Sequence, residues 1–306
     1  MKKEENNLHR FESLSELHKI LGLPKPLHPL ISLIRNDSDA IPPENLPSPF
    51  ILNFYKIAYK PNLSGKFKYG QSYYDFDEGG LCFSAPNQLK ATSDNDSDDH
   101  TGLGLFIHPD FFLGYPLAKK IKQYSFFSYE LNEALHLSEK EKETIISVFK
   151  IIEEELNSRI DDFSQDVVIA QIDLLLTYTN RFYNRQFITR KAVNSTVFQK
   201  LERILNEYFD DEKMITQGIP TVQQLAEQVN ISPSYLSDLL RSLLGQNAQQ
   251  FIHQKLIDKA KEKLSSTTLS VSEIAYELGF EHPQSFSRLF KAKTKQSPLE
   301  FRAKFN

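Results

Sequence analysis

Two stretches of the chain decide the fold of its second half: residues 221–236, TVQQLAEQVNISPSYL, and residues 270–291, SVSEIAYELGFEHPQSFSRLFK. The second stretch repeats the pattern of the first 49 positions later. Each opens with a hydroxyl residue followed three positions on by Gln or Glu, a capping box that predicts the start of a helix. Apolar residues then recur at i, i+3, i+4 and i+7, which indicates a helix with one buried face. They are Val222, Leu225, Ala226 and Val229, repeated by Val271, Ile274, Ala275 and Leu278.

Each of these helices ends at a residue that can turn the chain sharply. Asn230 and Gly279, again 49 positions apart, are residue types that readily adopt the left-handed conformation. A second helix then begins with Pro233 or Pro283 at its first position, where a missing N–H costs nothing. The repeat therefore predicts two helix-turn-helix units, at residues 221–244 and 270–294. The inner faces of the second helices also correspond: Leu236, Leu239 and Leu240 against Phe286, Leu289 and Phe290.

Paired helices of this kind occur in solenoids and in DNA-binding proteins. A solenoid needs three or more copies and this chain has two, which favours DNA binding. Between the units, the apolar pattern predicts one helix over residues 248–265, about 27 Å long. Such a helix fits two recognition helices in successive major-groove segments, roughly 34 Å apart on double-stranded DNA. The sequence thus predicts that one chain contacts two neighbouring segments of the groove.

The second helix of each unit presents polar residues on its predicted outer face. Asp238 fits two roles, accepting a hydrogen bond from cytosine or standing as a polar residue that repels phosphate. Residues 283–306 hold six basic residues and one acid, so this end is either a phosphate-facing surface or a solvated basic tail. The outer residues are Gln284, Ser287, Arg288 and Lys291 in the second unit, and Ser234, Ser237, Asp238 and Arg241 in the first.

The composition is that of a globular protein of about two domains. Its 306 residues are 40% hydrophobic and 25% charged with a formal net charge of -4, which excludes a disordered chain and names no partner. Cys82 is the single cysteine, and the start MKKEENNLHRF leads into no signal-peptide segment. No run of about 18 apolar residues occurs. We therefore expect a cytoplasmic protein with no part in the membrane.

The first half of the chain predicts a different architecture. Residues 1–49 combine a helix over residues 11–21 with an extended arm rich in proline. Residues 50–108 alternate aromatic and β-branched runs with turn residues, which is typical of short strands in a small barrel or sandwich. The candidate strands are FILNFYKIAYK (50–60), KFKYG (66–70), SYYDFD (72–77), LCFSAPNQL (81–89) and GLGLFIHP (102–109).

Beyond residue 109 the period becomes helical. Ser138 and Glu141 form a capping box ahead of one amphipathic helix, and residues 165–187 predict a second. The two helices fit either a hairpin that pairs subunits or ordinary packing on the barrel wall.

No group in this half points to catalysis. His28, His100, His108 and His136 are too scattered for a metal site, and His108 is typical of a turn before a helix. The acidic run SDNDSDDH (93–100) lacks the Gly and Glu of a calcium loop. Cys82 has no basic neighbour to activate it. We expect no catalytic residue, metal or cofactor.

The repeat resembles the DNA-binding domain of the AraC/XylS family of bacterial transcription regulators. The resemblance covers residues 221–305 and is most specific in VSEIAYELGFEHPQSFSRLFKAKTKQSPLEFR (271–302), which is similar to the family's I-A-x-x-x-G-F, S-x-F-S-R-x-F-K and P-x-x-F/Y-R. The first unit departs from the family pattern at LLRSLLG (239–245), where further basic residues are common. The resemblance implies base contacts from Ser234, Ser237, Asp238, Gln284, Ser287 and Arg288, and phosphate contacts from Arg241 and Lys291.

Less specifically, the first half resembles the cupin-like sensory domain that many family members carry ahead of a helical dimerisation segment. The stretch YGQSYYDFDEGGLCFSAPNQ (69–88) carries this resemblance. It implies a homodimer and a small-molecule effector inside the barrel. Interior candidates, each of which also fits an ordinary core position, are Tyr55, Tyr69, Tyr73, Phe83 and Phe106.

We therefore predict an α+β protein that regulates transcription by sequence-specific DNA binding under the control of an effector. In one alternative the first half serves only dimerisation; in another it is a cupin-type enzyme. Activation, with RNA polymerase as a further partner, and repression both fit these residues. The predicted parts are a helix and arm (1–49), a cupin-like sensory β domain (50–137), a helical dimerisation segment (138–190) and an AraC-type DNA-binding domain (195–306).

Overall fold

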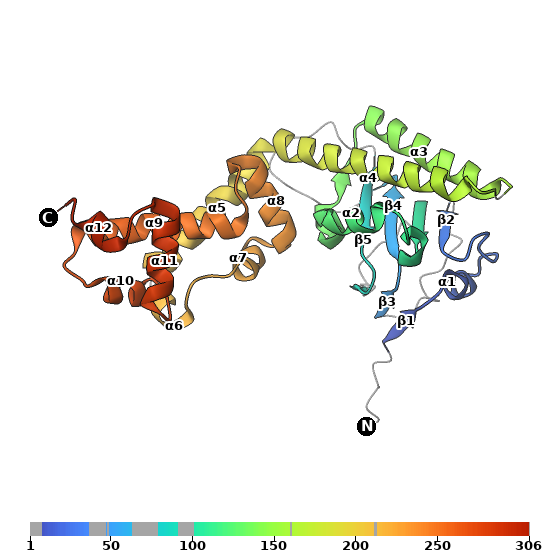
Figure 1. Ribbon diagram of the computed structural model, residues 1–306. Helices are drawn as coiled ribbons and strands as arrows, with labels where there is room; N and C mark the ends of the chain where they lie inside the picture. The colour runs from blue at the N-terminus through green and yellow to red at the C-terminus, as the bar shows by residue number, and fades with distance from the viewer. Residues whose placement is uncertain are drawn as a thin grey trace, which may run out of the picture. The chain divides into compact units, whose positions relative to one another are not determined.

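In the computed structural model the chain forms two compact units, an N-terminal unit of residues 1–186 and a C-terminal unit of residues 187–306 (Figure 1). The structure describes residues 8–36, 47, 49–62, 79–90, 101–159, 161–210 and 213–305. Two candidate strands, residues 66–70 and 72–77, and the acidic run 93–100 lie outside the described residues.

The first unit contains two sheets. An antiparallel five-stranded sheet has the order β2 (Ile31–Asn36), β7 (Gly102–Ile107), β4 (Tyr55–Lys60), β5 (Gly80–Ser84) and β8 (Leu135–His136). A second sheet has the order β1 (His9–Phe11), β3 (Phe50–Leu52) and β6 (Leu89–Lys90), with β1 and β3 parallel. Within the described ranges both sheets are open, so a closed cupin barrel is not confirmed.

The N-terminal segment differs from its prediction in two ways. The helix expected from residue 11 is α1 (Leu14–Ile20), because Ser13 caps it and Phe11 instead pairs with Leu52 in a strand. Part of the expected arm, β2, is an edge strand that pairs with β7. The strand Ile31–Asn36 buries four of its six residues, including the β-branched Ile31 and Ile34, which a solvated arm would leave exposed.

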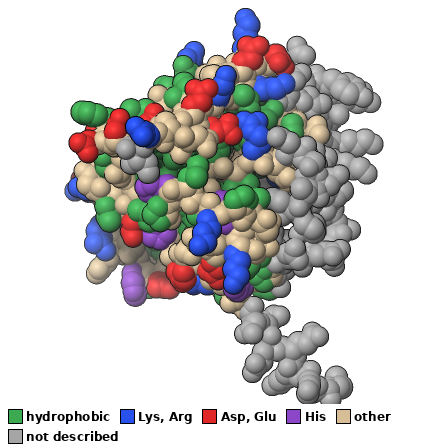
Figure 2. Space-filling model, turned by 90° about the vertical axis from the view of Figure 1, so that its right-hand side faces the viewer, with side chains coloured by type: hydrophobic (Ala, Val, Ile, Leu, Met, Phe, Trp, Pro, Cys, Tyr) green, Lys and Arg blue, Asp and Glu red, His purple; other side chains and the backbone are tan. Residues whose placement is uncertain are grey.

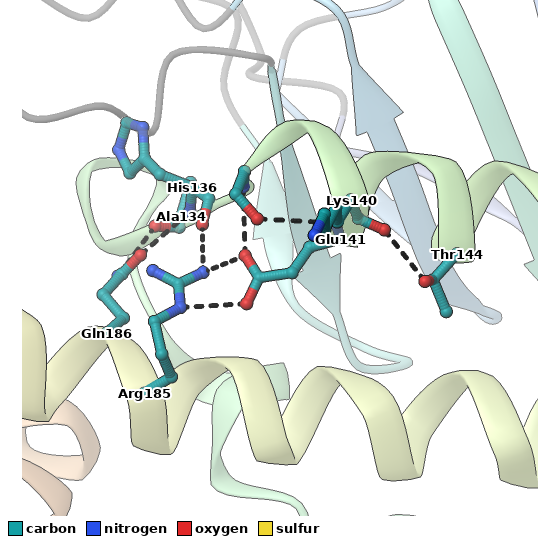
Figure 3. Close-up of polar contacts among 8 residues, drawn as sticks. Ala134, His136, Lys140, Glu141, Thr144, Arg185 and Gln186 are labelled. Atoms are coloured by element: carbon teal, nitrogen blue, oxygen red, sulfur yellow. Dashed lines mark hydrogen bonds and ion pairs between the residues drawn. The ribbon is translucent and has the colours of Figure 1, made fainter.

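Two long helices, α3 (Glu139–Asn157) and α4 (Ser164–Thr189), lie side by side next to the five-stranded sheet (Figure 1). The predicted capping box of Ser138 and Glu141 is confirmed. Arg185 on α4 pairs with Glu141 and donates to the His136 carbonyl at 2.8 Å. Gln186 accepts a hydrogen bond from the His136 N–H in β8 and donates one to the Ala134 carbonyl just before it. Figure 3 shows how these contacts fasten α4 to β8 and to the start of α3.

Short turns connect β7 to β8, including α2 (Leu117–Lys120) and a 3₁₀ turn at Pro109–Phe112. His108 caps that turn by accepting a hydrogen bond from the Asp110 N–H, as its position predicts.

The second unit is helical. In chain order its helices are α5 (Lys191–Asp210), α6 (Lys213–Gln217), α7 (Val222–Val229), α8 (Pro233–Leu244), α9 (Ala248–Ser266), α10 (Val271–Glu277), α11 (Pro283–Thr294) and α12 (Pro298–Arg302). The predicted linker helix is thus confirmed as α9, within one residue at its end.

Candidate nucleic-acid interface

The two helix-turn-helix units follow the same backbone path. Asn230 and Gly279 both adopt the left-handed conformation, with φ of 58° and 73°. The next residue then donates back to the preceding helix: Ile231 to the Ala226 carbonyl at 3.1 Å, and Phe280 to the Ala275 carbonyl at 3.0 Å. The predicted capping boxes at the starts of α7 and α10 are also present. Local sequence signals therefore set the same turn twice.

The second helices, α8 and α11, present their apolar faces to separate cores. Leu236 and Leu240 join the core of the first helix-turn-helix unit, and Phe286 and Phe290 join the core of the second helix-turn-helix unit. The long helix α9 divides its apolar face between both cores, with Ala248, Phe251 and Ile252 in the first and Leu256, Ile257, Ala260 and Leu264 in the second. This division fixes the two units on one helix.

Residues outside the repeat also join the two cores. Phe209 on α5 and Ile219 after α6 pack against both. Gly218 lies so close to Gly279 that a Cβ atom on Gly279 would come within 2.9 Å of the Gly218 carbonyl carbon. The Tyr208 hydroxyl donates to the Gly218 carbonyl at 3.1 Å. The sequence analysis did not predict these contacts between the two cores. The available signal was Gly-Ile-Pro (218–220) ahead of the first capping box.

The outer face of α11 is open and basic. Gln284, Arg288 and Lys291 are exposed and Ser287 is half-buried. Within the described part of the chain, neither Arg288 nor Lys291 forms an ion pair. On α9, burial and, to a smaller extent, the Lys293 ammonium lower the pKa of His253. Lys291 does interact electrostatically with the Glu300 carboxylate, whose pKa it helps to lower after the hydrogen bonds from Ser297. This face offers hydrogen-bond donors and net positive charge to a polyanion.

The outer face of α8 differs. Ser234, Ser237 and Asp238 are half-buried, while Arg241 is exposed. The Asp238 carboxylate forms an ion pair with Arg241 one turn later on the same helix. The two residues that the sequence assigned to separate contacts are thus each other's partners.

The candidate effector residues divide between two faces of the sheet. Phe83 lies opposite Ile57 in the ladder, which puts it on the same face as Tyr55, whereas Phe106 lies opposite Lys56 on the other face. Tyr55 and Phe83 both contact the Phe127 ring, with centroids 5.1 and 5.6 Å away.

These side chains are packed in apolar surroundings. Burial raises the pKa of the Tyr55 hydroxyl. Phe106 packs instead in a cluster with Phe11, Leu14 and Phe54. Tyr69 and Tyr73 lie outside the described residues.

Other kinds of site find no support in the ranges that the structure covers. No group of three or more His, Cys, Asp or Glu side chains there could hold a metal ion. No helix there has the length and apolar character needed to cross a bilayer. Cys82 is half-buried in β5. On the face shown in Figure 2, basic and acidic side chains are interspersed among the described residues.

A family model described as a helix-turn-helix domain matches residues 225–304, which include both turns and α9. The arabinose operon regulatory protein of Escherichia coli is 38% identical over 116 residues, which are 37% of this chain and 39% of that protein. The C-terminal unit is a DNA-binding domain of the AraC type.

For one relative, the sequence similarity extends beyond the AraC-type domain into the N-terminal unit, residues 1–186. The HTH-type transcriptional regulator YfiF of Bacillus subtilis is 24% identical over 263 residues, 82% of this chain and 77% of that protein. An AraC-type regulator structure from Chromobacterium violaceum, 20% identical with a TM-score of 0.32, covers 37% of this chain and 96% of that one. The chain spans about two fifths of the Escherichia coli relative. Both relatives are named as regulators rather than as enzymes.

Proposed function

We propose that the protein regulates transcription by laying α8 and α11 into two successive major-groove segments of a specific DNA site. The observation that carries this proposal is the duplicated turn on one shared helix: both reading helices leave equivalent turns, and both pack on α9. One rigid chain therefore addresses two neighbouring segments. RNA polymerase is the further partner if the bound protein activates transcription.

In this proposal α11 supplies most of the DNA contacts. Arg288 and Gln284 hydrogen-bond base edges, with Ser287 beside them, and Lys291 neutralises a phosphate. Their exposure supports these roles. In α8, Ser234 and Ser237 are the corresponding base contacts.

Two substitutions in α11 test the assignment. Arg288→Ala should cost about 1–3 kcal/mol on the cognate site and relax specificity at one base pair. Lys291→Ala should weaken binding to every sequence and reduce the salt slope by about 0.9. Fluorescence anisotropy on a duplex selected from random DNA, and on a scrambled duplex, measures both. The control is Arg203→Ala on α5, an exposed arginine outside the reading helices. Equal losses on both duplexes for Arg288→Ala would contradict its role as a base contact.

The N-terminal unit, residues 1–186, is proposed as a cupin-like sensor for a small molecule. The face of the sheet that carries Tyr55 and Phe83 supports this, because aromatic rings from outside the sheet converge on it. A bound effector raises the melting temperature by mass action. Melting shifts across a panel of small molecules, with native mass spectrometry of any hit, test it. A first unit that serves only dimerisation gives no shift with any compound.

The proposed homodimer uses the outer face of α4. Six residues of α4 between Val167 and Asn184, spaced alternately by three and four positions, form an exposed stripe with the spacing of a coiled-coil seam. A second copy of α4 running antiparallel fits this stripe. Arg181 would then face the small Ala170 of the other copy, whereas a parallel pair would oppose Arg181 to itself. Ala170 is flanked by Asp166, which accepts from the Tyr115 hydroxyl, and by Asp173, which pairs with Lys120. The stripe is Val167, Ala170, Leu174, Thr177, Arg181 and Asn184.

Engineered cysteines distinguish the two directions. In a Cys82→Ser background, the double variant Val167→Cys/Asn184→Cys should give an oxidised covalent dimer, because these positions face each other across an antiparallel seam. The single variant Val167→Cys should stay uncrosslinked. A dimer from the single variant indicates a parallel pair, and a monomer in sedimentation equilibrium removes the proposal.

A further inference from the structure

The reading helix of the first unit carries an internal ion pair. Asp238 and Arg241 lie three positions apart on α8, and the Asp238 carboxylate pairs with the Arg241 guanidinium. The Asp238 side chain is 16% exposed, and that of Arg241 is 57% exposed. The carboxylate is therefore mostly covered, next to a cation that stays open to solvent.

This pair makes the two reading helices very different in charge. Residues 233–244 of α8 contain one acid and one base, so their formal charges cancel. Residues 283–294 of α11 contain three bases and no acid. Since the turns before both helices have the same geometry, the fold does not cause the difference. Each phosphate that a protein neutralises adds about 0.9 to the salt slope of DNA binding, so α11 and α8 contribute unequally to it.

We infer that Asp238, a positioning residue that acts through Arg241, limits how much the first helix-turn-helix unit (residues 221–244) contributes to DNA affinity. By pairing with Arg241 it cancels the one cation of α8 and leaves little net attraction for phosphate. The second unit then anchors the protein on DNA of any sequence. The first unit adds binding mainly through uncharged Ser234 and Ser237, whose hydrogen bonds depend on the bases they meet. This inference rests on the proposed function, because it assumes that α8 faces DNA.

The substitution Asp238→Asn tests the inference, since it removes the charge and keeps the shape. Binding should become about 3- to 10-fold tighter on both cognate and scrambled duplexes at low salt, and the salt slope should steepen by about 0.9. Arg241→Ala should have little effect in the natural background but should undo the gain in Asp238→Asn. The control is Asp258→Asn on α9, which removes the same charge from an exposed carboxylate paired with Lys261 and should change affinity little.

The outcomes separate this inference from the proposed function. A loss confined to the cognate duplex in Asp238→Asn would mean that Asp238 contacts a base, and unchanged binding would mean that it does not limit affinity; either result overturns the inference. If Lys291→Ala also leaves binding unchanged, the proposed function itself fails. Thermal melts by circular dichroism check folding, and Asp238→Ser replaces the Asn variant if that variant is unfolded.

Discussion

The two helix-turn-helix units have the same turn geometry but reach it with different residues. The first uses Gln224 in its capping box, Asn230 in its turn and Gly245 after its second helix. At the equivalent places the second uses Glu273, Gly279 and Lys295. The repeat thus keeps its backbone conformations and hydrogen bonds with different side chains, and we expect those side chains to make the two helix-turn-helix units respond differently to mutation, pH and DNA.

The largest difference expected between the units is in their cores. Phe290 is fully buried, with ring centroids 5.7 Å from Phe286 and 5.6 Å from Phe301. Phe290→Ala should lower the free energy of unfolding by about 3–5 kcal/mol, because it leaves a ring-sized cavity. Urea unfolding followed by far-UV circular dichroism measures this. Its counterpart Leu240→Ala removes a smaller side chain and should cost less; a larger cost would break the comparison.

The turn residues should differ next. Gly279→Ala would place a Cβ atom 2.9 Å from the Met214 carbonyl oxygen at a positive φ, so it combines left-handed strain with a backbone clash. We expect a loss of about 2–3 kcal/mol in thermal denaturation. Asn230→Ala incurs the strain in the first unit, where Asn230 is exposed, and should cost about 1 kcal/mol. Equal losses would mean that the Gly218 contact does not constrain the second turn.

The ends of α8 and α11 offer a stabilising change. Lys295 adopts the left-handed conformation with φ of 63°, where the first unit has Gly245. Lys295→Gly should raise the free energy of unfolding by about 1 kcal/mol, because glycine has no Cβ to strain there. Gly245→Ala should lower it by a similar amount. Chemical denaturation of both variants checks the prediction, and a loss of stability in Lys295→Gly contradicts it.

The smallest expected difference is in pH dependence. Hydrogen bonds from the Ser270 backbone and side chain lower the pKa of Glu273, whose ordinary value is 4.5. The Glu273 cap therefore stabilises the second unit above that value and is lost as the pH falls through the lowered pKa. Glu273→Gln should flatten the pH profile of unfolding between about pH 5 and pH 3. Gln224→Glu should introduce the dependence into the first unit. Identical pH profiles of unfolding in the natural protein, Glu273→Gln and Gln224→Glu would contradict a stabilising role of the ionised cap.

The helical elements were predictable because their signals are local. Capping boxes, left-handed turn residues and apolar spacing lie within a few residues of one another, and α3, α7, α9 and α10 begin where these signals predict. The sheets were less predictable, since a strand is recognised by a distant partner. β2 pairs with β7, about 70 positions away, and this pairing turned part of an expected arm into a strand.

The candidate site residues also differ in how far the sequence could place them: helical positions follow from local spacing, and strand positions depend on pairing. The exposed positions of Arg288 and Lys291 follow from helical spacing alone. The separation of Tyr55 and Phe83 from Phe106 follows from the register of β4 with β5 and β7, which strand alternation cannot supply without knowledge of the pairing.

Helix spacing and caps in the amino-acid order were enough to predict two helix-turn-helix units and the path of their turns. The role of Asp238 stayed open at that level, because its carboxylate fitted both a contact to cytosine and a polar position that repels phosphate. Folding pairs it with Arg241 and covers most of its surface. Folding also brings Phe209 and Ile219 against both cores. These outcomes depend on which side chains meet and lose water in three dimensions, and that information is not contained in any short stretch of the chain.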